Sequence, residues 1–387
     1  MDHKNAGRVT AATTLNKEQA TDAAQKSTGK KVNKFIKNDV STALHDSAVL
    51  FWDHEGRLQT GYTTEIDYVM NVVGVVNLVE MIIRTNAKLF SIQTNKFNKS
   101  RYIELTKMGD RLLSALRIDV PSIRQSYHQH LFHPYFELFV RRARERDLDH
   151  LVYLRHALTT EEITRSNDVL QGFVSALREE GRSAKFKATL RRFQRGPNKN
   201  CQGLIRYLRK NLAQQGKINI RRYDLSYRRD GSLLTVPPCV TDHQTAKTQR
   251  EAFIKALRKS ELGKCGYAWK LEHSDCKGFM HHFLLVLDEA SVERQEEIDA
   301  VLRKIWNEVT DDTGLLIACN LLSPFYKNEG VGLLSNDDNE AWLIIRRIAI
   351  YMTQTDNYIK LNLPGNARAF GKAEFVGRSS ATEDATV

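Results

Sequence analysis

The spacing of apolar residues changes near residue 216, and this change constrains the fold more than any other feature of the sequence. Before it, Leu204, Leu208 and Leu212 recur at the spacing of one helix face. After it, Lys217–Tyr227 (KINIRRYDLSY) alternates in the manner of a strand. A mostly helical first part followed by a strand-containing second part is therefore expected.

The second part predicts four strands and two helices in the order βαββαβ, followed by a closing helix. The expected elements are Lys217–Tyr227, Thr245–Lys259, Lys264–His273, Phe279–Asp288, Ser291–Val309, Gly314–Asn320 and Glu340–Tyr358. This order is typical of a ferredoxin-like α+β fold, an antiparallel sheet with helices on one face. Its first and third strands form the central pair. The exposed sheet face of such a fold can receive a single nucleic-acid strand.

Four segments are expected along the chain. Residues 1–40 contain almost no large apolar side chains and predict a flexible basic arm. Residues 41–195 predict a helical module, in which Thr64, Pro121 and Thr160 open three long helices. The Gly-Pro in Arg195–Asn198 marks a boundary to a domain at 196–375, and 376–387 predict a flexible tail.

Positive charge is concentrated around this boundary. The chain carries a net charge of +12, and 15 Lys or Arg residues stand against two Asp between Arg182 and Asp230. Such a surface fits phosphate, and the interleaved aromatic residues fit stacking on unpaired bases; a solvated linker with basic helices is the alternative. The candidate nucleic-acid-binding residues are Arg191, Arg192, Arg206, Arg209, Lys210, Arg221, Arg222 and Arg347.

Other broad classes are disfavoured by composition. The most apolar stretch, Ile66–Ile83, is interrupted by four polar or charged residues, so no membrane span is expected. The N-terminus lacks a signal pattern, which favours a cytoplasmic protein. The five cysteines are odd in number and lack CxxC spacing, so reduced thiols are expected.

The stretch Lys277–Asp288 (KGFMHHFLLVLD) raises the question of a metal site. On a strand, Met280 and His282 share one face, while His281 lies on the other. If Ser274–Gly278 is a hairpin turn, Glu272 lies opposite Met280 and diagonal to His282. Glu272, position 280 and His282 then form the chemically sensible cluster, with His281 in a supporting or packing role. A thioether is a poor ligand for Mg or Mn.

A second group of histidines, His128, His130 and His133, is expected to pack or to lie on the surface. In a helix, residues two apart point about 200° away from each other, so His128 and His130 cannot easily share an ion. Pro134 would distort the next helical turn after His133.

Several stretches after Ile218 resemble the YagK/YfjJ-type family of prophage and filamentous-phage (inovirus) replication proteins. These belong to the HUH group of rolling-circle initiators. The stretches are RRYDLSY, GYAWKLEHSDCKGFMHHFLLVLD, the helix ending at Trp306, GVGLLSNDD, YMTQTDNY and RAFGK. The resemblance implies a nickase for single-stranded DNA. In it, two histidines hold a divalent ion, Mg or Mn, and a helix-borne tyrosine forms a 5′-phosphotyrosyl link.

Carried over by position, Tyr351 is the nucleophile, His282 the second histidine and Glu272 a third ligand. The first histidine is replaced by Met280, and the lysine one turn after the tyrosine is replaced by Gln354. The first departure removes a metal-binding imidazole, and the second removes a positive charge. Arg347, one turn before Tyr351, can supply charge, and His281 can replace the missing ligand only if a bulge re-aims it.

The residues leave several hypotheses open. Tyr351 follows the apolar stripe of its helix, so a core tyrosine is the alternative to a nucleophile. For Tyr358, two turns further on, the alternatives are a second nucleophile, a base-stacking residue and a packing residue. At the level of function, an active DNA nickase stands against a catalytically degenerate DNA-binding or regulatory protein. An RNA-binding sheet ranks last, because paired aromatics are missing from the central strands. The helical module can bind a protein partner.

Overall fold

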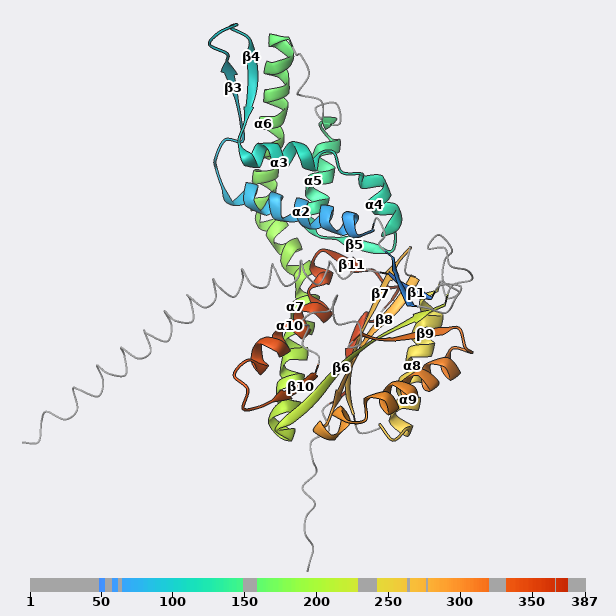
Figure 1. Ribbon diagram of the computed structural model, residues 1–387. Helices are drawn as coiled ribbons and strands as arrows, with labels where there is room; N and C mark the ends of the chain where they lie inside the picture. Colours follow the sequence, from blue (N-terminus) through green and yellow to red (C-terminus); the bar gives the residue numbers. More distant parts are fainter. Residues whose placement is uncertain are drawn as a thin grey trace, which may run out of the picture.

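The computed structural model describes residues 49–52, 58–61, 65–148, 159–228, 242–262, 265–275, 278–319, 332–365 and 367–374. The predicted N-terminal arm and C-terminal tail lie outside the described residues. Within them, the chain is α+β, with helices and antiparallel strand pairs (Figure 1).

The first part is mainly helical, as expected, but it also contains short strands. Its elements are β1 (Val49–Trp52), β2 (Leu58–Gly61), α2 (Glu65–Arg84), β3 (Phe90–Thr94), β4 (Arg101–Leu105), α3 (Lys107–Ala115), α4 (Val120–Ser126), β5 (His130–Phe132), α5 (Pro134–Arg144), α6 (Thr160–Arg182) and α7 (Ala184–Gln215). The second long helix expected from Pro121 is wrong. Pro121 stands in the seven-residue α4, and the next long helix opens at Pro134 instead.

Local sequence explains where the long helices begin. Thr159 caps α6 with a complete capping box, in which its side chain accepts from Glu162 N and the Glu162 side chain accepts from Thr159 N. Helix α2 is long and apolar enough to cross a membrane by length and composition alone. Half of its most apolar window is buried inside the protein, as befits a core helix.

The boundary expected at Arg195–Asn198 does not interrupt the helix. Helix α7 runs unbroken through Pro197 and ends at Gly216, whose φ of 74° suits glycine and whose N–H donates to Leu212 O (2.8 Å). The Pro197 carbonyl accepts a hydrogen bond from Gln354 Nε2 at 3.2 Å. A tertiary partner therefore accompanies a proline that local rules would place at a helix boundary.

The second part follows the predicted order closely. Its elements are β6 (Lys217–Tyr227), α8 (His243–Lys259), β7 (Gly266–Ser274), β8 (Gly278–Leu287), η2 (Glu289–Val292), α9 (Gln295–Val309), β9 (Gly314–Ala318), β10 (Gly332–Ser335), α10 (Ala341–Thr353), η4 (Thr355–Asn357), β11 (Ile359–Leu361) and β12 (Phe370–Lys372). The expected central pair is confirmed, since β6 pairs antiparallel with β8. The strand order is β10-β6-β8-β7-β12, and β9 also pairs with β6.

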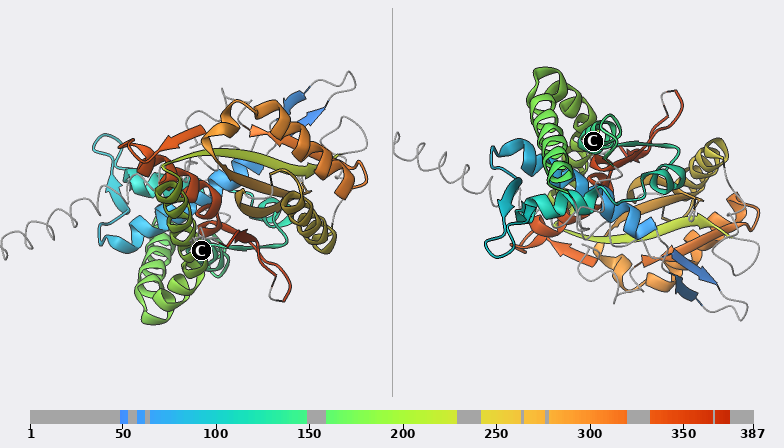
Figure 2. Two further views of the ribbon diagram at one scale, coloured as in Figure 1. Left: turned by 90° about the horizontal axis from the view of Figure 1, so that it is seen from below. Right: turned by 90° about the horizontal axis from the view of Figure 1, so that it is seen from above.

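Both faces of this sheet are covered, so the exposed face expected for a nucleic-acid strand is absent. Helices α8 and α9 pack on the face that carries Tyr223 and Phe283. Helices α7 and α10 cover the other face and share one apolar core with α2, α5 and α6 of the first part. Figures 1 and 2 show the sheet enclosed between these helices. The continuous core explains why no open platform remains.

Candidate functional site

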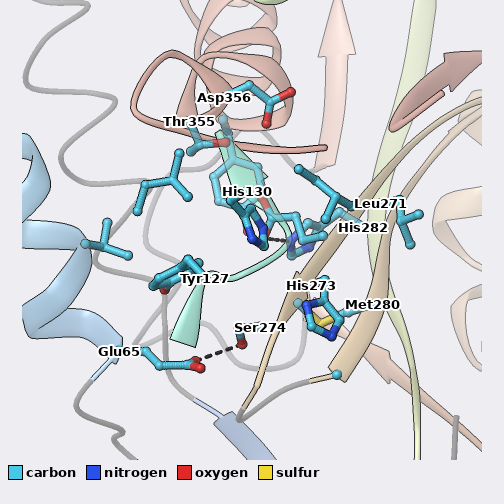
Figure 3. A pocket seen from close by; sticks show the side chains of 16 residues that line it. Glu65, Tyr127, His130, Leu271, His273, Ser274, Met280, His282, Thr355 and Asp356 are labelled. Atoms are coloured by element: carbon cyan, nitrogen blue, oxygen red, sulfur yellow. Dashed lines mark hydrogen bonds and ion pairs between the residues drawn. The ribbon is translucent and has the colours of Figure 1, made fainter. Parts of the chain in front are cut away.

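A cavity of about 100 Å³ lies on the face of the sheet that α7 and α10 cover, where the two parts of the chain meet. Strands β7 and β8 form one wall, and α10 with η4 forms another. Residues from α2 and β5 close the remaining side. Figure 3 shows Met280 and His282 from β8 in this cavity, together with Thr355 and Asp356 from η4.

The register of the β7–β8 hairpin sets the positions of the predicted cluster. Glu272 lies opposite Met280, and His282 lies opposite Lys270, so Glu272 is diagonal to His282 as expected. His281 points to the opposite face, where its Nε2 lies 3.2 Å from Ala246 O. No bulge re-aims it, so the condition under which His281 could replace the missing ligand is not met. Burial lowers the pKa of His281 to about 3.

His282 is held between two carboxylates. Its Nδ1 lies 2.7 Å from Asp224 Oδ1, and its Nε2 lies 3.0 Å from Glu272 Oε2. Burial alone would lower the pKa of His282, but Asp224 and Glu272 outweigh it and raise this pKa to about 9. Burial likewise opposes the charge of Asp224, yet His282 and Arg222 lower the pKa of Asp224 to about 2. Both groups are therefore charged at neutral pH.

Lys270 places a second cation in the same cluster. Its side chain is 2% exposed, and its ammonium lies 2.5 Å from Glu272 Oε1 and 3.2 Å from Asp356 Oδ1. It also donates to Thr355. Burial opposes its charge, but Asp356 and Glu272 outweigh it and raise the pKa of Lys270 above its ordinary value. Glu272 and Asp356 are thus paired with a cation of the protein itself.

Tyr351 joins this cluster from α10. Its ring lies 5.7 Å from the His282 ring, edge to face, and the Arg222 guanidinium lies over it at 4.2 Å. Tyr351 also lines the cavity. The structure therefore brings together Tyr351, His282 and Glu272, the three residues that the family resemblance assigns to nicking.

Two other predicted catalytic residues lie elsewhere. Helix α10 ends at Thr353, so Tyr358 does not share its face with Tyr351, and the two-turn spacing argument is wrong. Tyr358 is buried beside the ring of His133 at 6.3 Å, and burial raises its pKa to about 12. Gln354 joins α10 to α7 through Pro197 and accepts from Asn357 Nδ2 at 2.6 Å. Neither side chain lines the cavity.

The residues of the cavity do not fit a divalent ion. Both ring nitrogens of His282 already face carboxylates, and Lys270 takes the side of Glu272 that a metal would need. Among the described residues, no group of three His, Cys, Asp or Glu side chains is arranged to hold a metal. The expected Mg or Mn ion stays a prediction.

The two arginines of β6 are also placed differently from the expectation. Arg221 and Arg222 are each only 4% exposed and point to opposite faces. Arg221 donates to Gln295 Oε1 (2.8 Å) and lies 3.9 Å from Asp299 Oδ1. Neither can contact a nucleic acid in this arrangement. Arg347 is exposed on α10 and does not line the cavity, so the guanidinium beside Tyr351 is that of Arg222.

Helix α7 presents the remaining predicted cations to solvent. Arg191, Arg192, Arg206, Arg209 and Lys210 are all exposed, as expected, and so are Arg195 and Lys199. At about 100° per residue, these seven side chains fall within roughly a third of the helix circumference. They define a surface that we call the α7 ridge. Helix α7 contains nine Lys or Arg and no Asp or Glu.

Trp342 was not predicted and stands at one end of this ridge. It is 43% exposed on α10, and the Arg209 guanidinium lies over its ring at 5.0 Å. In the sequence, the position of Trp342 at the polar start of a helix was the signal that its side chain is exposed. Lys270 was also missed, although a lysine two residues before Glu272 on an apolar strand shares its face.

His128, His130 and His133 each have a different partner. His133 caps α5 by accepting from Tyr135 N (3.1 Å), His128 Nδ1 lies 3.3 Å from Asp275, and His130 stacks on His273 at 6.2 Å. Their predicted role as packing or surface residues is confirmed. The helix expected around them is wrong, because His130 begins β5 and His133 precedes α5.

Comparisons of the chain with protein-family models, with curated proteins and with solved structures found no match. The resemblance to phage replication proteins therefore rests on the quoted stretches and stays a prediction.

Proposed function

We propose that this chain is a single-stranded-DNA-binding protein of the HUH-like replication-initiator type. The observation that carries the proposal is the α7 ridge. Among the described residues, no carboxylate forms an ion pair with Arg191, Arg192, Arg206 or Arg209. Cations that have no carboxylate partner in the described part of the chain are available to neutralise phosphates and release counterions. Trp342 beside Arg209 adds an aromatic face on which a base can stack.

The sheet topology supports the HUH-like assignment. Strands β9, β6, β8 and β7 lie in this order with antiparallel neighbours, and α8 and α9 provide the two crossovers. We interpret this order as the split βαβ arrangement of ferredoxin-like folds. We assign DNA binding to the α7 ridge rather than to the sheet, because both sheet faces are buried.

The arrangement of charges in the cavity favours a protein that binds DNA without metal-dependent nicking. In a nickase, the ion would polarise the scissile phosphate, a role that needs open coordination positions. Here Lys270, His282 and Arg222 already neutralise Glu272, Asp356 and Asp224. The cluster in this arrangement stabilises the junction between the sheet and α10. The surface that contacts DNA is then the α7 ridge.

The test is the affinity of a labelled single-stranded oligonucleotide of mixed sequence, measured by fluorescence anisotropy. The double variant R206Q/R209Q removes two cations of the ridge, and R303Q/K304Q removes two exposed cations of α9 as a matched control. We expect the first variant to lower the salt-dependence slope by about 1.4, since each phosphate contact on a single strand contributes about 0.7. The control should behave as the parent. Equal binding by all three proteins would reject the ridge as the binding surface.

A second candidate function, tyrosine-mediated nicking, is favoured by the position of Tyr351 against His282 and Arg222. Its test is a covalent protein–DNA adduct on a denaturing gel in the presence of Mn. An adduct that is lost in Y351F and kept in Y358F would establish this activity. An adduct formed only by M280H would show that the missing histidine is what silences the site. Absence of an adduct from every variant, together with DNA binding, leaves the binding function alone.

A further inference from the structure

The hairpin of β3 and β4 carries a highly exposed aromatic side chain. Phe97 stands in the loop between the two strands and is 95% exposed. The hairpin lies at the periphery of the molecule in every view (Figures 1 and 2). Single exposed apolar residues are common on protein surfaces, so exposure alone assigns no role. The surroundings of Phe97 do.

The loop that holds Phe97 is closed by its own hydrogen bonds. Asn95 N donates to Ser100 O (2.8 Å), and Phe97 N donates to Asn95 Oδ1 (2.9 Å). Ser100 N donates to Asn98 Oδ1 at 3.1 Å. Such side-chain turns fix the backbone locally. Phe97 is therefore presented outward by an ordered tip.

Cationic residues stand on both sides of Phe97 in the sequence. Lys96 and Lys99 flank Phe97 in the loop, and Arg101 begins β4. The first acidic residue after the tip is Glu104, whose Oε2 accepts from Gln93 Nε2 at 3.1 Å. An apolar ring between positive side chains, with no acid in the loop, is complementary to stacked bases between phosphates.

The base of the hairpin is anchored in the core. Phe90, the first residue of β3, is buried, and its carbonyl accepts from Gln171 Nε2 of α6 at 2.8 Å. Thr106, directly after β4, caps α3 by accepting from Gly109 N. A ribbon fixed at its base can hold an inserted side chain against the tendency of bases to restack.

We propose that Phe97 is a wedge that inserts between neighbouring bases where single-stranded DNA joins a duplex. Lys96, Lys99 and Arg101 then contact the flanking phosphates. Insertion of an apolar side chain between base steps partly unstacks them. The inference rests on the proposed DNA binding and adds a second contact surface, separate from the α7 ridge.

A membrane surface is the other class of partner for an apolar tip with lysines. One phenylalanine ring contributes far less anchoring than an acyl chain, and even a single myristoyl chain binds only marginally. The loop also carries Asn95, Asn98 and Ser100, which would lose their hydration in hydrocarbon. DNA insertion needs only the ring to leave water, so we favour DNA.

The test uses a forked DNA with 2-aminopurine at the last paired position, whose fluorescence rises when the base unstacks. The full-length parent protein should raise this fluorescence, and F97A should not. Alanine substitution of a stacking aromatic should weaken fork binding by about 5- to 150-fold. V292A, which shortens another exposed apolar side chain, is the matched control and should match the parent. Because Phe97 is exposed, F97A should fold normally.

The outcomes separate the wedge from the proposed function. Anisotropy on a purely single-stranded oligonucleotide is measured in parallel with the same proteins. If the parent binds the single strand but leaves 2-aminopurine unchanged, or if F97A acts as the parent does, the wedge is rejected and DNA binding stands. If the parent binds neither DNA, both proposals fail. Phe97-dependent sedimentation with phosphatidylserine vesicles, without a fluorescence change on the fork, would overturn the wedge in favour of a membrane contact.

Discussion

Substitution of Lys270 by methionine tests whether an internal cation balances the cavity. Methionine keeps much of the volume and flexibility of lysine but leaves Glu272 and Asp356 without their buried partner. Removing one member of a buried ion pair typically costs about 3–5 kcal/mol, because the other charge stays buried and uncompensated. We place K270M at the lower end of that range, since Glu272 is partly exposed and retains His282.

The assay is urea unfolding at pH 7, followed by tryptophan fluorescence and circular dichroism. K304M is the matched control: Lys304 is a surface lysine whose side chain is 78% exposed, so its loss should change the free energy of unfolding by less than about 0.5 kcal/mol. Adding D356N to K270M should recover part of the loss, because the stranded carboxylate is removed. Destabilisation by K270M no larger than that by K304M would refute the internal-cation argument.

Three further predictions follow from the same geometry. The pKa of His282 is raised to about 9 in the folded protein, so the stability that protonated His282 contributes is fully present below its ordinary pKa of about 6.5 and is lost as pH rises through 9. H282Q should therefore be less stable than the parent at pH 6.5 and should lack this part of the pH dependence. An identical dependence of stability on pH in both proteins would contradict this prediction. Q354A should cost about 0.5–1.5 kcal/mol in urea unfolding, because it removes the bond to Pro197 O and the acceptor of Asn357 Nδ2, and an unchanged midpoint would show that these bonds contribute nothing. Saturating MnCl₂ should leave the Tm of the parent unchanged, and a clear rise would show that the cavity admits an ion after all.

Local pattern predicted the second part of the fold well. The alternation in Lys217–Tyr227 and the turn before Phe279 set the strands and the register of the hairpin, so the diagonal position of Glu272 and His282 could be derived. These features depend on residues close in sequence or on strands joined by a short turn. They are therefore visible in one sequence without knowledge of the rest of the molecule.

The errors at Pro197, Arg221 and Arg222 concern contacts between distant segments. Pro197 reads as a boundary, but Gln354, 157 residues further along the chain, donates to its carbonyl within an unbroken helix. The burial of Arg221 and Arg222 depends on α9 and α10 packing against opposite faces of β6, with Asp299 and Tyr351 as their neighbours. Such pairings leave no local periodic signal. For the same reason, the internal cation Lys270 could be noticed in the sequence but not assigned.

The salt dependence of single-stranded DNA binding, measured by anisotropy in EDTA and again in Mn, is the direct test of DNA binding by the α7 ridge. We expect the parent to bind without a divalent ion and to lose affinity steeply between about 50 and about 200 mM salt, as phosphate contacts by several cations require. We also expect R206Q/R209Q to show a shallower slope. Absence of binding in EDTA with binding restored by Mn, or binding that ignores salt, would contradict an account based on the α7 ridge.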